Sequence, residues 1–592
     1  MLPQGYQELR SFLGTQQEEF RIAYLPPASW ATRFSWADHY FLDPAVVFMP
    51  KPTVYMTSEQ EQTPGSSLIR WVYSSFYRGR TSRLGSLMGL LGVRYIILRP
   101  DADTPKNHDG LRWMGITETQ NLLQYQRDLK EVSRFGDYML YETPAYHPAI
   151  YSAEQIIITL GDRNILHSIL EIGLPIWKAA IIPIETTLSG KEILERSRII
   201  VVQGGDPTPL QASLSGVRIR PWEGLELSSN PSDAWYAGGA AWWLEKGGVN
   251  SAPYGFAITT GENTLSKKIT IPRRGNYFLF ISIFSGSSDS KGLEVTLGGY
   301  KKIIRPTGRA STDYIWEALG PIELEEGEAY LNLRGLGGLN AVSTIYLISL
   351  EGLEDTEQMV VERAHTGPID IILLMEEDSW FSEENSTLIF SPLFSGGSAI
   401  RFYRSLRANF TTLWEEDYFI LAKLEGQSRD ISMSIDGILL KELKTMMGEP
   451  ALQVYGPVRL RGGIHSIEIS SRGGGALDLV AISTSEPSNW LRTVPNRMSY
   501  SGNPTLEYQF LCTRNMLVVH NIDHLNLWLP EGCRKLGDPL EYGALYIAER
   551  EGECVLHYTP FGRLLPHFTL HIAISSFMLL IGLLGILREK MA

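Results

Sequence analysis

The segment LGPIELEEGEAYLNLRG at residues 319–335 recurs, with substitutions, as YGPVRLRGGIHSIEISS at residues 455–471, an offset of 136 residues. Both copies read as a strand, a glycine-containing turn and a second strand. Upstream, GNYFLFIS at 275–282 parallels EDYFILAK at 416–423. A strand pattern that repeats in this way predicts two tandem β-sandwiches of a jelly-roll-like type, each about 130 residues long.

The chain before the repeat alternates between helical and extended patterns. Apolar residues recur at helical spacing between residues 84 and 91, Gly92 follows, and Arg94–Leu98 reads as a strand. Further strand patterns at Gln155–Leu160 and Arg198–Gln203 are separated by helical ones. This alternation predicts an N-terminal α/β domain.

We therefore expect a multidomain chain whose parts follow one another in sequence. Helical periodicity nearly disappears after Gly204-Gly205-Asp206-Pro207, which sets the first boundary. The expected parts are an α/β domain at 1–205, a first β-sandwich at 206–355, a second at 356–488, a β-rich membrane-proximal stem at 489–565 and a transmembrane helix at 566–588.

The C-terminal segment FTLHIAISSFMLLIGLLGIL, from Phe568 to Leu587, has twenty residues without a charge. A helix of this length spans a hydrocarbon core of about 30 Å. Arg588 and Lys590 follow it, whereas only Arg563 lies just before it, so the positive-inside rule places the C-terminus in the cytoplasm. The residues after Met1 have neither a basic nor an apolar signal-peptide region. We expect a single-pass protein of the cell membrane with its bulk outside the cytoplasm.

Two further patterns bear on an exterior location. Asn385-Ser-Thr and Asn409-Phe-Thr are N-glycosylation sequons. Cys512, Cys533 and Cys554 fall within 43 residues, so two of the three could form a disulfide outside the cell, or all three could be buried thiols. Their spacing is not that of a zinc site.

Charge and motifs exclude several functions. With 53 basic and 66 acidic residues the net charge is −13, which argues against nucleic acid as a partner. Neither G-x-S-x-G nor H-E-x-x-H occurs, and we predict no catalytic residue. Asp101-Ala-Asp103 has a metal-binding spacing but lies beside Pro100, where we expect a surface turn. No cofactor is expected beyond a structural calcium ion in a sandwich.

An aromatic cluster marks the beginning of the first sandwich. It comprises Trp235, Tyr236, Trp242 and Trp243. Flat rings stack on the apolar faces of sugars, so these residues are the predicted carbohydrate-binding site. The alternative is that the rings fill the seam between the α/β domain and the sandwich.

Several phrases carry a family resemblance: RIAYLPP at 21–27, Leu91–Ile97, Leu140–Pro144, His147–Tyr151 and Ile271–Tyr277. Together they resemble the extracytoplasmic part of multi-spanning membrane glycosyltransferases of the GT-C class, such as arabinofuranosyltransferase-like proteins, with inserted carbohydrate-binding modules. That family holds its catalytic acid among N-terminal membrane helices, which this sequence does not contain. The resemblance therefore implies a glycan-related role and assigns no catalytic residue.

Three functional hypotheses follow. The first is a non-catalytic, membrane-anchored ectodomain that binds a glycan or a lipid-linked sugar, or docks on a separate polytopic glycosyltransferase. The second is a structural envelope or surface-layer protein that uses its sandwiches for protein contacts. The third is a glycosyltransferase or glycosidase with its site between the α/β domain and the first sandwich.

Overall fold

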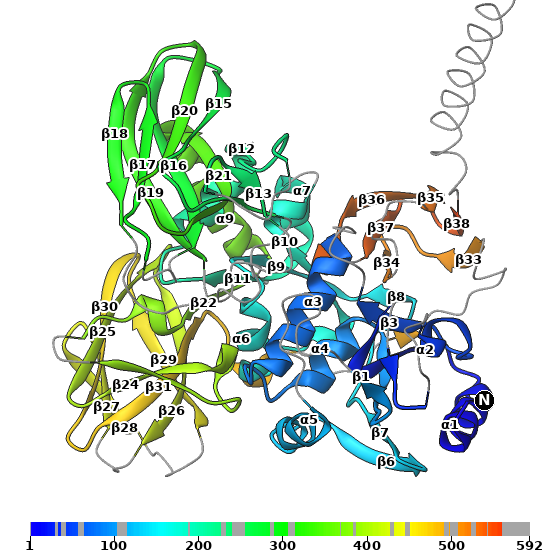
Figure 1. Ribbon diagram of the computed structural model, residues 1–592. Coiled ribbons are helices and arrows are strands. Elements are labelled where there is room, and N and C mark those ends of the chain that lie inside the picture. The colour runs from blue at the N-terminus through cyan, green and yellow to red at the C-terminus, as the bar shows by residue number, and fades with distance from the viewer. Residues whose placement is uncertain are drawn as a thin grey trace, which may run out of the picture.

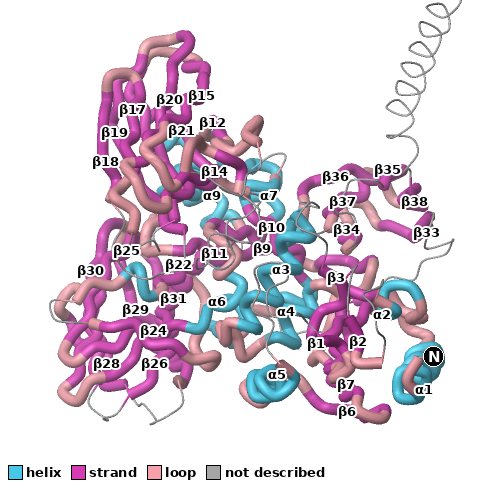
Figure 2. The backbone as a smooth tube through the Cα atoms, viewed as in Figure 1, coloured by secondary structure: helices cyan, strands magenta, loops and turns pink. Residues whose placement is uncertain are grey.

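The computed structural model of the protein is β-rich, with an N-terminal α/β region (Figures 1 and 2). The structure describes residues 2–29, 33–36, 43–56, 64–103, 115–187, 190–226, 232–238, 255–284, 289–305, 314–367, 369–382, 386–426, 431–443, 450–490, 496–497, 507–521, 528–541 and 543–558.

The first unit is a five-stranded sheet in the order β3-β1-β4-β7-β6, in which β1 pairs in parallel with β3 and β4. Its elements are α1 (Gln4–Thr15), β1 (Arg21–Ser29), β2 (Arg33–Phe34), α2 (Pro44–Val47), β3 (Thr53–Met56), α3 (Pro64–Tyr77), α4 (Leu84–Leu90), β4 (Val93–Leu98), β5 (Ala102–Asp103), α5 (Ile116–Leu123), β6 (Lys130–Phe135) and β7 (Tyr138–Glu142). Helices α3 and α4 pack their apolar faces on this sheet and on the next one, in one core.

The Asp101-Ala-Asp103 motif is not the surface turn that the sequence predicts. Asp101 is buried and accepts hydrogen bonds from the Trp36 indole N–H and the Tyr138 hydroxyl, each at 2.7 Å. Nearby, the buried Arg99 forms an ion pair with Asp43 at 2.7 Å. The Asp101 carboxylate holds the loop after β4 in place, because its partners come from two other segments.

The second unit is a parallel sheet in the order β10-β9-β11-β22. Its elements are β9 (Gln155–Leu160), α6 (Ile165–Ile172), β10 (Ala179–Pro183), α7 (Gly190–Arg196), β11 (Ser197–Gln203), α8 (Thr208–Ser215), α9 (Leu350–Thr366) and β22 (Asp370–Met375). The strands are apolar on both faces, as expected where helices or a second layer cover both sides. The first sandwich lies between α8 and α9 in the chain, so it is an insertion in this unit.

Strand β22 belongs to two structures at once. It pairs in parallel with β11, Ile199 opposite Asp370, and in antiparallel fashion with β31 (Gly475–Ser483) of the second sandwich, Ile372 opposite Ser483. The sequence predicts residues 370–375 in the second sandwich alone, because an apolar strand pattern does not identify the strands that pair with it. The domain boundaries stay predictions, but the two units share one nine-stranded sheet.

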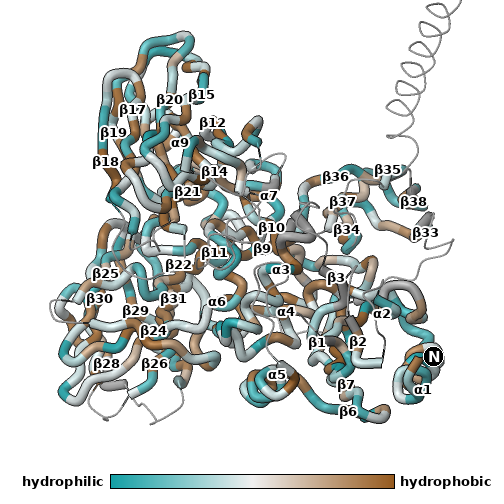
Figure 3. The backbone as a smooth tube through the Cα atoms, viewed as in Figure 1, coloured by the Kyte–Doolittle hydropathy of each residue, from teal (hydrophilic) through white to brown (hydrophobic). Residues whose placement is uncertain are grey.

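Sandwich 1 comprises strands β12–β21 in two layers. One layer contains β12 (Val217–Ile219), β13 (Tyr236–Ala237), β14 (Ala257–Thr259), β16 (Gly275–Phe284), β19 (Tyr314–Leu324) and β21 (Asn340–Ser349). The other contains β15 (Thr264–Ile271), β17 (Leu293–Leu297), β18 (Tyr300–Ile304) and β20 (Gly327–Gly335). Figure 3 shows hydrophobic residues within the sheets and hydrophilic ones at the outer tips of this sandwich.

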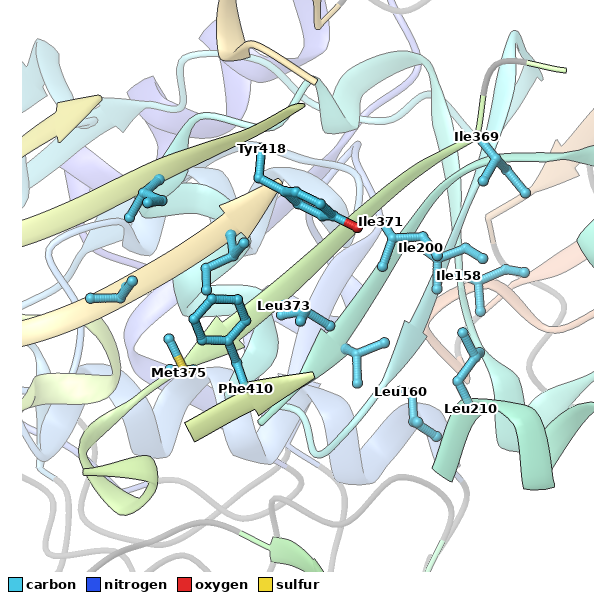
Figure 4. Packing of buried hydrophobic residues seen from close by; sticks show 14 of the residues in the cluster. Ile158, Leu160, Ile200, Leu210, Ile369, Ile371, Leu373, Met375, Phe410 and Tyr418 are labelled. Atoms are coloured by element: carbon cyan, nitrogen blue, oxygen red, sulfur yellow. The ribbon is translucent and has the colours of Figure 1, made fainter. Parts of the chain in front are cut away.

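Sandwich 2 comprises β22 and strands β23–β31. One layer is the continuation of the shared sheet, with β23 (Thr387–Phe390), β24 (Ser398–Phe402), β26 (Glu416–Gly426), β29 (Ala451–Leu460) and β31. The other contains β25 (Ser405–Thr412), β27 (Ile431–Ile435), β28 (Ile438–Leu443) and β30 (Gly463–Ser471). Its core runs without a break into that of the parallel sheet: in Figure 4, Phe410 lies beside Leu373 and Met375, and Tyr418 points toward Ile371.

The two sandwiches have the same strand pairing, in agreement with the sequence repeat. Strand β16 pairs with β19 and β21, as β26 pairs with β29 and β31. The repeat glycines Gly320 and Gly456 both have positive φ, beside the same irregularity in the ladder. The hydroxyls of Tyr277 and Tyr418 each donate to a carbonyl four residues upstream, at 2.8 and 3.0 Å.

The last unit is a pair of small sheets near β8 (Ile150–Ala153), which pairs with β34 (Leu517–His520). Its other strands are β32 (Asn496–Arg497), β33 (Glu507–Cys512), β35 (Trp528–Glu531), β36 (Cys533–Gly537), β37 (Ala544–Ala548) and β38 (Gly552–Tyr558). The apolar segment Phe568–Leu587 lies outside the described residues. Among the residues that are described, no helix is both long and apolar enough to cross a membrane.

A buried ion cluster fixes sandwich 2 to helix α6. Lys423 on β26 lies 2.8 Å from Glu171 on α6 and 2.8 Å from Asp478 on β31, and all three are buried. Burial raises the pKa of Asp478 to about 6, against the pull of Lys423. The pKa of Glu171 is lowered, because Lys423 and Arg83 outweigh its burial. The lysine thus compensates two carboxylates that belong to different units.

Three of the buried histidines are kept neutral by desolvation, which lowers their pKa. Burial lowers the pKa of His167 on α6 to about 3, that of His147 to about 4 and that of His520 on β34 to about 3. His167 lies 4.8 Å from the Trp71 ring, and His520 lies 4.8 Å from the Trp528 ring. Each must therefore stay unprotonated for the fold to keep its packing.

We expect Lys423→Met to lower the free energy of unfolding by about 3–5 kcal/mol, because it leaves buried carboxylates without their cation. Asp478→Asn in the same chain should restore part of the loss, since the amide oxygen still accepts from the Ser395 N–H. Urea unfolding measures both. Lys268→Met, which removes the surface pair with Glu328, is the control and should change stability by less than about 1 kcal/mol. Equal effects of the two lysine variants would contradict this role.

We expect acid to destabilise the fold through the buried histidines. Their folded pKa values lie below the unfolded value near 6.5, so their contribution is complete above that pH and is lost as pH falls towards 3–4. When the pH falls from 7.5 to 5.5, each of these histidines should lower the free energy of unfolding by about 1.4 kcal/mol. Urea midpoints at both pH values measure this. His520→Phe keeps a ring and should remove its share; an unchanged acid shift in that variant would refute the assignment.

Candidate functional site

The chain order of the parallel sheet creates a crevice at the carboxyl ends of its strands. From β9 the chain passes to β10 on one side, and from β11 it passes to β22 on the other. The connections after β9 and β11 therefore lead away from each other, and ligands in open α/β sheets bind at this kind of switch point. The turns that follow β9, β11 and β22 define the site.

A hydrogen-bonded bridge connects these three turns. The Gln203 side-chain oxygen accepts from the Asp162 N–H at 2.8 Å, and its amide nitrogen donates to Glu376 Oε2 at 3.1 Å. Ser168 donates to the other oxygen of Glu376. Asp162 Oδ2 in turn accepts from the N–H of Tyr314 at 2.9 Å, which attaches the first residue of β19 to the sheet edge. Sandwich 1 is thereby held over the crevice.

The turn after β11 needs two glycines. Gly204 has φ +97° and donates its N–H to the carbonyl of Leu374 at 2.7 Å. A Cβ on Gly205 would lie 2.4 Å from the carbonyl oxygen of Asn409 on β25. This is the Gly204-Gly205 pair that marks the end of helical periodicity in the sequence, and it lets sandwich 2 approach the sheet edge closely.

The parallel sheet, sandwich 1 and the first turn of sandwich 2 enclose a cavity of about 270 Å³, which we name the junction cleft. It is lined by Gln203, Gly204, Gly205, Asp206, Pro209, Phe280, Tyr314, Ile315, Trp316, Glu317, Ala318, Glu376, Asp378, Ser379 and Phe381. These residues come from the turns after β11 and β22 and from β16 and β19. They are far apart in sequence, and the insertion of sandwich 1 brings them together.

The polar part of the junction cleft is acidic. Four carboxylates line it, those of Asp206, Glu317, Glu376 and Asp378, and the described lining residues include neither lysine nor arginine. Burial raises the pKa of Glu317, and Lys302 offsets only part of this. A negative field of this kind disfavours phosphates and other anions, and carboxylate oxygens can accept hydrogen bonds from hydroxyl groups.

The apolar part of the junction cleft contains exposed aromatic surface. Phe381 is 67% exposed, and its backbone exchanges two hydrogen bonds with Arg407 on β25, at 2.7 and 2.8 Å. Trp316 is half-buried and stacks on Tyr346 at 5.7 Å. A flat ring beside carboxylate acceptors can hold a molecule that has an apolar face and hydroxylated edges.

The predicted carbohydrate-binding aromatics lie elsewhere, and their role stays a prediction. Trp235 is 5% exposed, packs in the core of sandwich 1 and donates its indole N–H to the carbonyl of Asn263 at 3.0 Å. Burial leaves little of its ring for a ligand. Tyr236 is half-buried, with its hydroxyl on Asp233 at 3.0 Å. Trp242 and Trp243 lie outside the described residues.

The other predicted positions are distributed as follows. Asn409 is exposed on β25, and Asn385 lies outside the described residues. Cys512, Cys533 and Cys554 are free thiols, buried in one core, and burial raises the pKa values of the Cys512 and Cys533 thiols. No disulfide joins them in this structure. In the part of the chain that is described, no group of three acidic, histidine or cysteine side chains is placed to hold a metal, so the calcium ion stays a prediction without a site.

Sequence reasoning missed the acids at the sheet edge. Glu376, Glu377 and Asp378 follow the apolar strand IILLM directly, a pattern that places polar groups at the carboxyl end of a buried strand. That signal was present in the sequence. It gained meaning only with the knowledge that β22 is a parallel strand, because the switch-point rule applies to open α/β sheets.

Comparison with known proteins adds the following. No protein-family profile matches the chain, and no curated protein sequence matches it. In structure it is similar to arabinofuranosyltransferase AftD from Mycobacteria, at 9% identity and a TM-score of 0.44. The similarity covers 94% of this chain and 62% of the AftD chain, so the chain spans less than two thirds of that protein.

Smaller parts of the chain are similar to carbohydrate-binding modules. One is the C-terminal module of family 6 from the laminarinase LamC of Zobellia galactanivorans, at 13% identity and a TM-score of 0.16, covering 19% of this chain and 98% of the module. Another is a family 35 module from Clostridium thermocellum, at 14% identity and 0.16, covering 19% and 96%. Both kinds of neighbour were expected from the sequence, but at these scores they assign no family and no ligand.

Proposed function

We propose that this protein is a glycan-binding accessory ectodomain that holds a neutral saccharide in the junction cleft. The observation that carries the proposal is the composition of that cleft. An exposed Phe381 ring and the Trp316 ring lie among four carboxylates at the carboxyl edge of a parallel sheet. Aromatic faces stack on the C–H faces of a sugar ring, and carboxylates accept hydrogen bonds from its hydroxyls.

The acidity of the junction cleft limits the class of ligand that it can bind. A lipid-linked sugar phosphate brings negative charge to within a few ångströms of Asp206, Glu376 and Asp378, with no basic side chain among the described lining residues. Like charges at that distance repel each other strongly in a partly buried site. The proposal is therefore a neutral glycan, and a lipid-linked donor is the less favoured of the two ligands that the sequence analysis named.

A non-catalytic role and attachment to the membrane are parts of this proposal. The sequence resemblance brings no catalytic residue to any position of this chain. The apolar segment Phe568–Leu587 would anchor the protein, with the binding units outside the cytoplasm, where Asn385 and Asn409 could be glycosylated and a polytopic glycosyltransferase could be its partner.

Glycan binding is tested with Phe381→Ala. Isothermal titration with neutral oligosaccharides of glucose, mannose, galactose and arabinofuranose should show at least a tenfold weaker affinity for the variant, because stacking is lost. Phe390→Ala is the matched control, since Phe390 is 68% exposed and lies outside the cleft lining. Equal affinities of the two variants would contradict the proposal. Shorter oligosaccharides in the same mixtures would favour the alternative of a glycosidase, for which Glu317, with its raised pKa, is the candidate acid.

Membrane attachment is tested with two arginines in the apolar segment. Each charged residue at the centre of a spanning helix costs about 2.5–3.5 kcal/mol on insertion. The full chain should stay with the membrane fraction after alkaline carbonate extraction, whereas Leu579→Arg/Leu580→Arg should be released. The Leu579→Ala/Leu580→Ala variant controls for loss of side chains and should stay. Release of the unmodified chain would refute the anchor.

A further inference from the structure

Position-by-position comparison of the two sandwiches shows where they differ. Tyr277 on β16 and Tyr418 on β26 are equivalent, and Phe284 and Glu425 lie seven positions after them. On the neighbouring strands, Ile258 is paired with Ala341 in sandwich 1, and Arg401 is paired with Ala476 in sandwich 2. The positions of Ile258 and Phe284 in sandwich 1 are thus those of Arg401 and Glu425 in sandwich 2.

In sandwich 1 these positions are packed. Ile258 and Phe284 belong to a buried cluster on the outer face of their sheet, together with Phe256, Tyr314, Leu339 and Ala341. The rings of Phe284 and Tyr314 lie 5.6 Å apart. Apolar side chains fill this face with the close packing that is usual in protein interiors.

In sandwich 2 the equivalent face is covered in part by a small apolar cluster of Phe394, Ala399 and Ala476, and a cavity lies at the end that contains Arg401 and Glu425. This cavity of about 160 Å³, which we name the sandwich-2 pocket, is lined by Arg401, Phe402, Tyr403, Glu425, Gly426, Gly473, Gly474, Gly475 and Ala476. Arg401 and Glu425 are both opposite Ala476, on the strands at its two sides. Their side chains therefore stand on one face, and strand spacing separates their backbones by about 10 Å.

The residues that line the sandwich-2 pocket give it a small apolar base, two charged sides and an opening to solvent. Ala476 is small and buried, and it forms the floor between the Arg401 and Glu425 walls. Tyr403, in the turn between β24 and β25, is 59% exposed beside it. Three consecutive glycines, Gly473–Gly475, also line the pocket and carry no side chains that could fill it; Gly474 has φ +80°, where a side chain would be strained, and a Cβ at this position would lie beside the Tyr403 ring.

From this geometry we infer that the sandwich-2 pocket is a second binding site, which takes a single neutral sugar ring. The tyrosine ring supplies a stacking face, Arg401 donates hydrogen bonds and Glu425 accepts them, so hydroxyls at both edges of the ring have partners. The Glu425 carboxylate repels an anionic ligand and the Arg401 guanidinium repels a cationic one, so the pocket favours a neutral ligand. The volume of the sandwich-2 pocket is below the roughly 300–1,000 Å³ of pockets that hold drug-sized molecules, so the pocket accommodates a single sugar ring.

The site is separate from the junction cleft and does not depend on it. The sandwich-2 pocket uses β24, β26 and β31, whereas the cleft uses the turns after β11 and β22 together with β16 and β19. Each can therefore be removed without the other, and a failure of one proposal leaves the other testable.

The test uses saturation-transfer NMR of the full chain with methyl glycosides of glucose, mannose, galactose and arabinofuranose. In a chain that carries Phe381→Ala, we expect binding of at least one glycoside to remain. Adding Tyr403→Ala should weaken it at least tenfold. Adding Glu425→Phe, which installs the sandwich 1 residue, should do the same. Tyr330→Ala is the matched control, because Tyr330 is 58% exposed on β20 of sandwich 1, and it should leave binding unchanged.

The outcomes separate the two sites. If Tyr403→Ala and Glu425→Phe leave binding equal to that of the Tyr330→Ala chain, or if the Phe381→Ala chain binds no glycoside, the second site is refuted while the cleft can stand. If Tyr403→Ala alone removes all binding and Phe381→Ala removes none, the second site stands and the cleft fails. Circular dichroism confirms that each variant is folded, and a variant that melts early is replaced by Tyr403→Leu.

Discussion

Strand β22 is hydrogen-bonded to a neighbour along each of its two edges, and the arrangement of the other units depends on this. Its first edge closes the parallel sheet against β11, and its second edge begins the antiparallel sheet against β31. In sandwich 1 the equivalent place beside β21 is taken by the three-residue strand β12, which among the described strands pairs with β21 alone. Because β22 has no free edge, sandwich 2 and the parallel sheet share one core and cannot move independently. The buried Lys423 cluster adds an electrostatic connection at the same boundary.

This arrangement determines where a site can form. Sandwich 2 continues the sheet beyond β22, and sandwich 1 is inserted between α8 and α9 and attached to the carboxyl end of β9 through Asp162 and Tyr314 (Figure 1). Asp162 and Gln203 use their side chains to connect the turns and the first residue of β19, which leaves the junction cleft between three units. The glycines at 204 and 205 are required there because two backbones approach closely.

The sequence predicted what is local and repeated, and it could not predict what depends on distant pairing. The Gly-Pro strands and the Tyr277 and Tyr418 positions revealed two related sandwiches, because their pattern recurs at a constant offset. The partner of β22 was not predictable, since an apolar strand reads the same in a parallel sheet and in a sandwich. For the same reason Glu376 and Asp378 had no visible connection with Trp316. Trp235 was singled out by composition, but an aromatic residue in a strand serves a core as readily as a surface.

The difference between the two sandwiches argues that a shared fold does not imply a shared role. Equivalent backbones place Ile258 and Phe284 in one copy and Arg401 and Glu425 in the other. The first pair buries apolar surface, a few kcal/mol of stabilisation for large side chains. The second pair gives up that burial and exposes charge around a small alanine floor. Selection for stability alone would fill these positions in the second copy as it fills them in the first, so the polar cavity at this end of the face is the feature that a function has to explain.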